Sequence, residues 1–187
     1  MARILAFSGA TRLTSLNRRL AAIAARDLRA LGAAVTELSL LDFPLPFVDE
    51  DGRPNPPPEA HAFNAALQGH DGLFIATPEY NSGYPPILKN AFDWASMCNR
   101  GKPGLAGKVV ALGAASPGPR GGYRGLMQLR ATLELGFGAL VIPEMAPLPF
   151  ANKALAEEGV LADESAAKML AACLQRLLWE VKLRRKD

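Results

Sequence analysis

Residues 77–94 limit the possible folds of this chain more than any other stretch. The apolar run over residues 72–76 precedes them, and apolar residues at helical spacing occupy their second half. Pro78 removes a backbone donor and favours an extended residue before it, so a strand should end there. Pro85 and Pro86 fit the first turn of a helix, where a missing N–H leaves no intrahelical acceptor unpaired. We therefore predict a strand, a loop and a helix, and the carboxyl end of such a strand is where open α/β sheets bind ligands.

Further apolar segments alternate with helical patterns along the chain. Strands are also predicted over residues 3–8, 34–38, 108–115 and 139–142, with helices over residues 16–31, 59–68, 124–135 and 157–183. Strand–helix–strand units pair their strands in parallel. The sequence therefore predicts an α/β fold, a doubly wound and mostly parallel sheet of five strands in three layers. A length of 187 residues fits a single domain spanning 1–187.

Residues 43–58 differ in composition from the rest, because they contain six of the fifteen prolines. A flexible linker is one interpretation. Phe43, Leu45, Phe47 and Val48 are too apolar for a freely solvated linker, which favours an ordered segment packed on the domain.

Charge and cysteine content exclude several classes of protein. The net charge of +3 is mild, and the basic cluster at residues 182–186 is short, so we expect no nucleic-acid partner. Cys98 and Cys173 are far apart without a CxxC motif, as in reduced intracellular proteins. No basic leader precedes an apolar run, and no run reaches the roughly 18 residues of a membrane span. We expect a cytoplasmic protein without a membrane partner.

Three loops follow the first, third and fourth predicted strands, and the doubly wound sheet would gather them on one edge. The first loop, residues 8–15, carries hydroxyl groups and Arg12 directly before a helix. Free N–H groups and a positive dipole end at a helix N-terminus, joined by hydroxyls and a guanidinium, suit a phosphate monoester. The alternative is a capped helix with Ser15 as its N-cap and no ligand.

Other nucleotide and hydrolase signatures are absent from the sequence. GxGxxG does not follow the first strand, and neither GxxxxGK[ST] nor GxSxG occurs. His61 and His70 have no partner at metal-ligand spacing, so no metal site is predicted. The second and third loops are rich in backbone groups and poor in titratable side chains, which suits a flat heterocycle with redox chemistry of its own. Alternatively, Gly121 and Gly122 only begin a helix and Tyr80 only packs.

Two motifs resemble a known family. PEYN at residues 78–81 with LKNAFDW at residues 88–94 is similar to the signature of the NADPH-dependent FMN reductase family, which includes flavin, quinone, azo-dye and chromate reductases. Residues 9–17 resemble the phosphate loop of that family, and residues 116–122 resemble its third loop. The similarity extends over about residues 3–180, and it implies a flavodoxin-like sheet in the order 2-1-3-4-5.

The resemblance also implies which residues bind FMN. Those expected to hold the phosphate are Thr11, Arg12, Ser15 and Asn17. Those expected to line the ribityl chain and the isoalloxazine ring are Pro78, Glu79, Tyr80 and Asn81, with Ser116, Gly118, Gly121 and Gly122 on the pyrimidine side. Two residues depart from the family pattern: Ala10 replaces a phosphate-binding serine, and Pro86 replaces a common glycine.

The family further implies a reaction. NADPH or NADH delivers hydride to the flavin, leaves, and is replaced by a quinone, flavin, azo or metal-oxyanion acceptor in a ping-pong cycle, without a catalytic side chain. Arg120 and Arg124 are candidates for a 2′-phosphate contact. Family members are commonly homodimers or homotetramers, so a homo-oligomer is expected. The helix after Pro86 and residues 43–58 are candidates for that contact.

Two other functions fit the same fold. One is a flavodoxin-type electron carrier, although the +3 charge contrasts with the acidic surfaces of such carriers. The other is a ligand-binding module without enzymatic activity, which the changes at Ala10 and Pro86 would favour. Bound flavin separates the module from the enzyme, and steady NADPH oxidation with a quinone separates the carrier from the enzyme.

Overall fold

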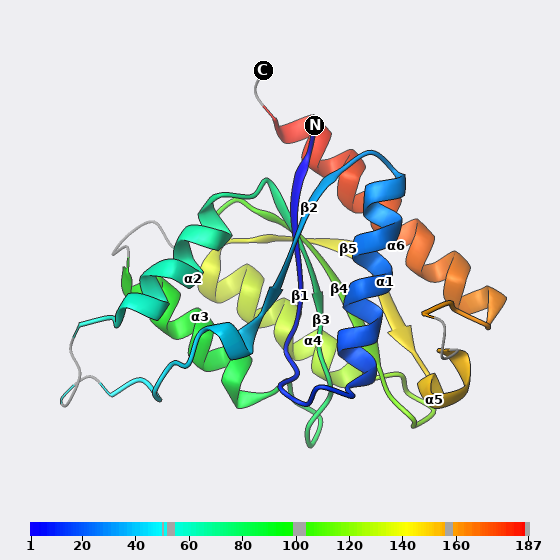
Figure 1. Cartoon of the computed structure of the whole chain (residues 1–187), viewed down its shortest axis with the longest axis horizontal. Helices are drawn as coiled ribbons and strands as arrows, with labels where there is room; N and C mark the ends of the chain where they lie inside the picture. The colour runs from blue at the N-terminus through cyan, green and yellow to red at the C-terminus, as the bar shows by residue number, and fades with distance from the viewer. Residues whose placement is uncertain (50, 52–54, 99–103, 156–158, 186–187) are drawn as a thin grey trace.

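The computed structural model describes residues 1–49, 51, 55–98, 104–155 and 159–185. Within these residues, five strands form one parallel sheet in the order β2-β1-β3-β4-β5, which confirms the predicted fold (Figure 1). The elements are β1 (Arg3–Ser8), α1 (Leu16–Ala30), β2 (Ala34–Ser39), η1 (Leu40–Asp42), α2 (Pro58–Gln68), β3 (Gly72–Ala76), α3 (Pro86–Cys98), β4 (Val109–Ala115), α4 (Tyr123–Ala131), η2 (Thr132–Gly136), β5 (Leu140–Leu148), α5 (Ala151–Ala154) and α6 (Glu164–Arg184).

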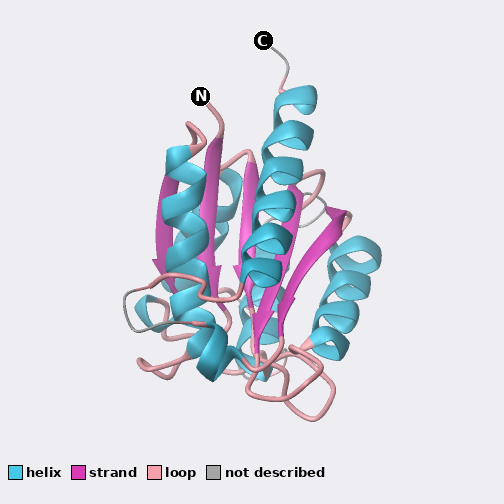
Figure 2. Ribbon diagram, turned by 90° about the vertical axis from the view of Figure 1, so that its right-hand side faces the viewer, coloured by secondary structure: helices cyan, strands magenta, loops and turns pink. Residues whose placement is uncertain are grey.

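Helices cover both faces of the sheet and give three layers (Figure 2). One face packs against α1 and α6, and the other against α2, α3 and α4. The alternation of β1 shows why, since Ile4 and Ala6 face the first pair while Leu5 and Phe7 face the second group. All five residues of the central strand β3 are buried, as expected for a parallel strand covered on both sides.

The fifth strand extends beyond its predicted end. The sequence predicts an end before Pro143, but β5 continues to Leu148. Two features explain why β5 can contain Pro143. β5 is an edge strand, and its pairing with β4 shifts register between Val110 and Leu112. A proline is accepted at an edge or a bulge, where no neighbouring strand needs its N–H.

Two predicted helices have different limits in the structure. The helix expected over residues 124–135 is α4, which ends at Ala131 and continues as the π-helical turn η2. The helix expected from residue 157 begins at Glu164, with Asp163 as its N-cap accepting the N–H of Ala166 at 2.8 Å. Residues 157 and 158 lie outside the described part of the chain. The cap explains the later start, because Asp163 satisfies a backbone donor of the first turn.

The start of the proline-rich segment packs on the domain in part as predicted, although Phe47 is 75% exposed. Phe43 and Leu45 lie against the core under α2 and α3. The side chains of Asn90 and Trp94 both donate to the carbonyl oxygen of Pro46, at 2.8 and 2.7 Å. Part of the LKNAFDW motif therefore fixes this segment against α3.

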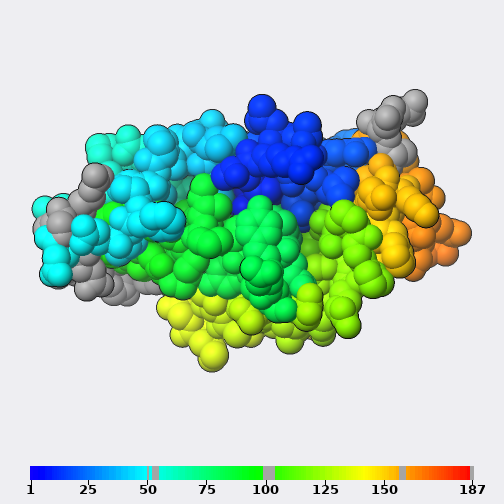
Figure 3. Space-filling model, turned by 90° about the horizontal axis from the view of Figure 1, so that it is seen from below, coloured from blue at the N-terminus to red at the C-terminus, as the bar shows by residue number. Residues whose placement is uncertain are grey.

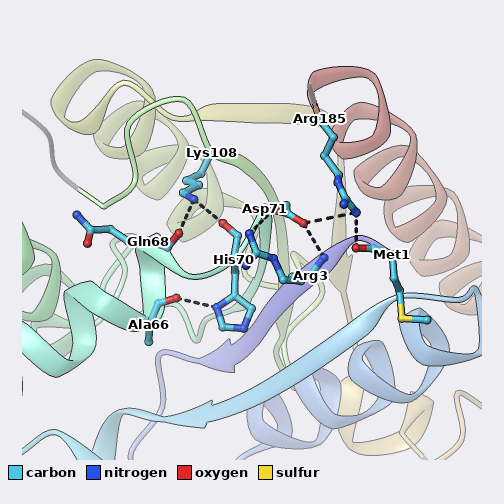
Figure 4. Close-up of polar contacts among 8 residues, drawn as sticks. All are labelled: Met1, Arg3, Ala66, Gln68, His70, Asp71, Lys108 and Arg185. Atoms are coloured by element: carbon cyan, nitrogen blue, oxygen red, sulfur yellow. Dashed lines mark hydrogen bonds and ion pairs between the residues drawn. The ribbon is translucent and has the colours of Figure 1, made fainter. Parts of the chain in front are cut away.

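Charged residues close the edge of the sheet opposite the three loops (Figure 4). The carboxylate of Asp71 accepts the backbone N–H of Arg3 at 2.8 Å and its guanidinium at 2.9 Å. Partial burial of Asp71 favours the neutral acid. The hydrogen bonds from Arg3 and the positive charge of Arg3 outweigh this effect and lower the pKa of Asp71. Lys108 donates to the carbonyl oxygens of Gln68 and His70 at the end of α2. Among the described helices, none is long and apolar enough to span a bilayer.

Candidate functional site

The three predicted loops lie side by side at the carboxyl edge of the sheet (Figure 3). Hydrogen bonds between neighbouring strands set where each loop leaves the sheet. The N–H of Gly9 donates to Ala76 at 2.9 Å, and the N–H of Thr77 donates to Gly113 at 2.9 Å. Because the strand order places β1 beside β3 and β3 beside β4, the first, second and third loops are neighbours.

The first loop presents donors and no acid. Thr11, Arg12 and Thr14 are exposed, and the Nε of Arg12 donates to the Oγ1 of Thr14 at 2.9 Å. Ser15 caps α1 by accepting the N–H of Asn17, and the first turn of α1 contains no acidic residue. Ser15 alone makes the capping bond, so the exposed hydroxyls of Thr11 and Thr14 and the guanidinium of Arg12 are not needed for a cap. This donor set fits the phosphate of FMN.

Asn17 is placed differently from the other predicted phosphate contacts. It is buried, and its amide pairs with the end of β4: Nδ2 donates to the carbonyl oxygen of Ala115 at 2.9 Å, and Oδ1 accepts the N–H of Ala115 at 2.8 Å. Both polar atoms of the side chain are therefore engaged. Asn17 joins the start of α1 to the start of the third loop.

The second loop turns back on itself after Glu79. Tyr80 and Gly83 exchange two backbone hydrogen bonds of 2.8 and 2.9 Å, and the residues between them, Asn81 and Ser82, have φ of 49° and 68°. Two positive φ angles in succession define a type I′ turn. Tyr80 is 53% exposed, so its ring is accessible to a ligand.

Glu79 connects the second loop to the start of α4. Its carboxylate accepts the N–H groups of Arg124 and Gly125 at 3.0 and 3.2 Å, and it binds the guanidinium of Arg124 with Nε at 2.8 Å. Burial would favour the neutral acid, but these bonds outweigh it and lower the pKa of Glu79. A carboxylate at a helix N-terminus also complements the helix dipole. Arg124 is thus engaged, which leaves Arg120 as the other candidate for a 2′-phosphate.

The third loop is held against the ends of β4 and β5. The Oγ of Ser116 accepts the N–H of Gly118 at 3.2 Å. Gly121 and Gly122 have φ of 59° and 81°. A Cβ at Gly121 would lie 2.8 Å from the nitrogen of Pro149, and one at Gly122 would lie 2.6 Å from the Cβ of Ala114. Close packing and the positive φ angles therefore require glycine at both positions, independently of any ligand.

The two departures from the family pattern are accommodated locally. Ala10 is buried, and its N–H donates to the Oγ of Ser8 at 3.1 Å. Pro86 is the first residue of α3, where a proline is favoured. The sequence did not indicate one further residue that holds the third loop, Phe150. Its φ is 48°, and its N–H donates to the carbonyl oxygen of Gly118 at 3.3 Å. No local sequence pattern indicates a left-handed phenylalanine.

Comparisons with known proteins agree with this geometry. A family model described as NADPH-dependent FMN reductase matches residues 2–153. An NAD(P)H-dependent FMN reductase of Pseudomonas aeruginosa is 38% identical over 130 residues, which are 68% of this chain and 69% of that protein. A quinone reductase of Pseudomonas putida is 32% identical over 180 residues, 95% and 93% of the two chains. The solved structure of a flavoenzyme NAD(P)H:(acceptor) oxidoreductase from Paracoccus denitrificans has a TM-score of 0.80 at 26% identity, covering 98% of both chains.

The packing of Gly122 generates a prediction with a matched control. Gly107 has a similar φ of 72°, but nothing lies within 4 Å of a Cβ built there. Gly107→Ala should therefore lose only the left-handed preference, about 1–2 kcal/mol of unfolding free energy. Gly122→Ala should lose about 1–3 kcal/mol more, because its methyl group meets Ala114. Urea unfolding measures both, and equal losses in the two variants would contradict the packing role.

The carboxylate of Glu79 generates a pH-dependent prediction. Glu79→Gln should lower the unfolding free energy by about 1–3 kcal/mol at pH 7, because bonds to a charged acceptor are lost. The pKa of Glu79 is lower in the folded than in the unfolded chain. At pH values between these two pKa values, the unfolded chain therefore binds more protons than the folded chain. The stabilisation is present above the unfolded-state pKa and disappears as the pH falls through the folded-state pKa.

Urea unfolding between pH 7 and pH 3 therefore tests the role of Glu79. The difference between the wild type and Glu79→Gln should shrink below a pH of about 4. Glu134→Gln is the control, because Glu134 also pairs with an arginine but is more exposed. A difference that stays constant down to pH 3 argues that packing and not the carboxylate holds the second loop.

Proposed function

This chain belongs to the NADPH-dependent FMN reductase family, and from that premise we propose that it carries electrons from NAD(P)H through bound FMN to a small-molecule acceptor. The protein is an NAD(P)H-dependent oxidoreductase with FMN as cofactor. The observation that supports the finer proposal is the meeting of a loop of phosphate donors with two backbone-rich loops at one sheet edge.

The first loop would hold the phosphate of FMN. Thr11 and Arg12 are exposed donors in front of α1, and the hydroxyl hydrogen of Ser15 is free to donate while its oxygen caps the helix. Backbone N–H groups at the helix start add to the same site. Asn17 would act indirectly, since its bonds to Ala115 fix the loop relative to β4.

The second and third loops would bind the ring and the ribityl chain. Pro78, Glu79, Tyr80 and Asn81 would line them on one side, with backbone groups supplied by the type I′ turn. The third loop would close the pyrimidine edge, through residues Ser116, Gly118, Gly121 and Gly122. FMN would supply the redox chemistry, so the side chains need only orient it and the two substrates. The Glu79–Arg124 pair would keep the two loops at a fixed separation.

The reaction would follow a ping-pong order, because both substrates must reach the same flavin. A quinone is the favoured acceptor, since several relatives are named quinone reductases; free flavins, azo compounds and metal oxyanions belong to the same proposal. We further propose one FMN-binding domain over residues 1–187, a homodimer or homotetramer, and a cytoplasmic location. Arg120, at the rim of the third loop, would contact the 2′-phosphate of NADPH.

An anaerobic spectroscopic titration tests the proposed function. The protein is mixed with FMN, freed of unbound flavin, and titrated with NADPH before a quinone is added. We expect bound flavin that NADPH bleaches and the quinone reoxidises over many turnovers. Bound flavin that NADPH leaves yellow would point to the electron carrier, and a colourless protein would point to the module without enzymatic activity.

Arg12 provides a sharper prediction about the phosphate site. Arg12→Ala should weaken FMN binding about tenfold to a hundredfold, because a charge-assisted hydrogen bond contributes about 1.5–3 kcal/mol. Arg26→Ala is the control, since Arg26 is an exposed arginine of α1 that pairs with Asp27. Flavin fluorescence quenching measures both dissociation constants. Equal affinities for the two variants would place the phosphate away from the first loop.

A further inference from the structure

A cavity of about 420 Å³ lies beside the first loop, on the side towards β2. It is bounded by the carboxyl ends of β1 and β2 and by the first turns of α1, and its size is typical of small-molecule sites. Ala10 lines this cavity and also belongs to the first loop. No residue of the second or third loop lines it, so it is separate from the proposed flavin ring site.

The walls of this cavity combine a cation, a hydroxyl and carboxylates. Arg18 donates to the Oγ of Ser39 across the cavity, at a long 3.3 Å. Glu37 and Asp42 line the same cavity near the end of β2, and Glu37 binds Arg29 at 2.8 Å on the exposed surface. A guanidinium suits phosphate oxygens. In dinucleotide-binding sheets, an acid at the end of the second strand accepts the hydroxyls of a ribose.

We propose that this cavity binds an adenosine 5′-phosphate group. The inference rests on the proposed function, because it takes the flavin phosphate to lie on residues 11–15. From that position the flavin ring must extend towards β3 and β4, since β1 lies between β2 and β3 in the sheet. Any group attached to the other side of the phosphate then extends towards β2. Ala10 is shared by the loop and the cavity, so such a group enters it directly.

Two molecules carry this group to the site. FAD is FMN extended by an adenylyl group on its phosphate, so its adenosine would follow the path just described. The adenosine end of NAD(P)H is the other source, and it would reach the cavity while FMN is bound. The chemistry of the walls is the same for both: Arg18 for phosphate, and Glu37 or Asp42 for the ribose hydroxyls.

A substitution that fills the cavity tests this inference. Ala22 is exposed on α1 and lines the cavity, so Ala22→Trp should block it without entering the core. Ala30→Trp is the matched control, because Ala30 is exposed on the same helix outside the cavity. Arg18→Met is a second variant that removes the cation and leaves the space. Flavin fluorescence gives the affinities for FMN and FAD, and calorimetry gives the affinity of the FMN-loaded protein for 5′-AMP.

If the source is FAD, the wild type and Ala30→Trp bind FAD about tenfold more tightly than FMN, and Ala22→Trp and Arg18→Met lose that advantage while keeping their FMN affinity. If the source is NAD(P)H, FAD has no advantage, but 5′-AMP binds the FMN-loaded wild type and binds both variants about tenfold more weakly. If the protein binds FMN but shows neither the FAD advantage nor the 5′-AMP binding, this inference is overturned and the proposed function is not. Absent FMN binding overturns the proposed function and this inference together.

Discussion

The parallel pairing of β1, β3 and β4 is the constraint on which the rest of this structure depends. Because these strands are neighbours with their carboxyl ends at one edge, three loops that are far apart in sequence must meet there. Backbone bonds from Gly9 to Ala76 and from Thr77 to Gly113 fix where two of the loops begin. Asn17 adds a link from α1 to Ala115, across 98 residues of chain. The site is therefore a consequence of strand order.

The three loops divide the work according to their chemistry. The first has exposed hydroxyls, Arg12 and a helix N-terminus without acids, which together attract a phosphate. The other two offer mainly backbone groups to a ligand. Close packing at Gly121 and Gly122 holds the third loop, and the carboxylate of Glu79 ties the second loop to the start of α4. The charge of Glu79 is neutralised by Arg124 and the start of α4. Such a site positions a cofactor with redox chemistry of its own, as the family assignment requires.

Local sequence patterns predict those parts of the fold that local forces decide. The apolar run before Pro78 gives β3 to the residue, and Ser15 caps α1 as its hydroxyl suggests. The passage of β5 through Pro143 was not predicted, because edge position and the register shift depend on the other strands. The Glu79–Arg124 pair joins residues 45 positions apart. Its existence depends on how two loops meet in space, which no window of sequence contains.

The account is tested most directly by a crystal structure of the protein with FMN. It predicts the phosphate within hydrogen-bond distance of residues 11–15 and the ring between residues 78–81 and residues 116–122, with the Glu79–Arg124 pair intact. A flavin bound at any other edge or face of the sheet, or a phosphate without a contact to the first loop, would contradict it.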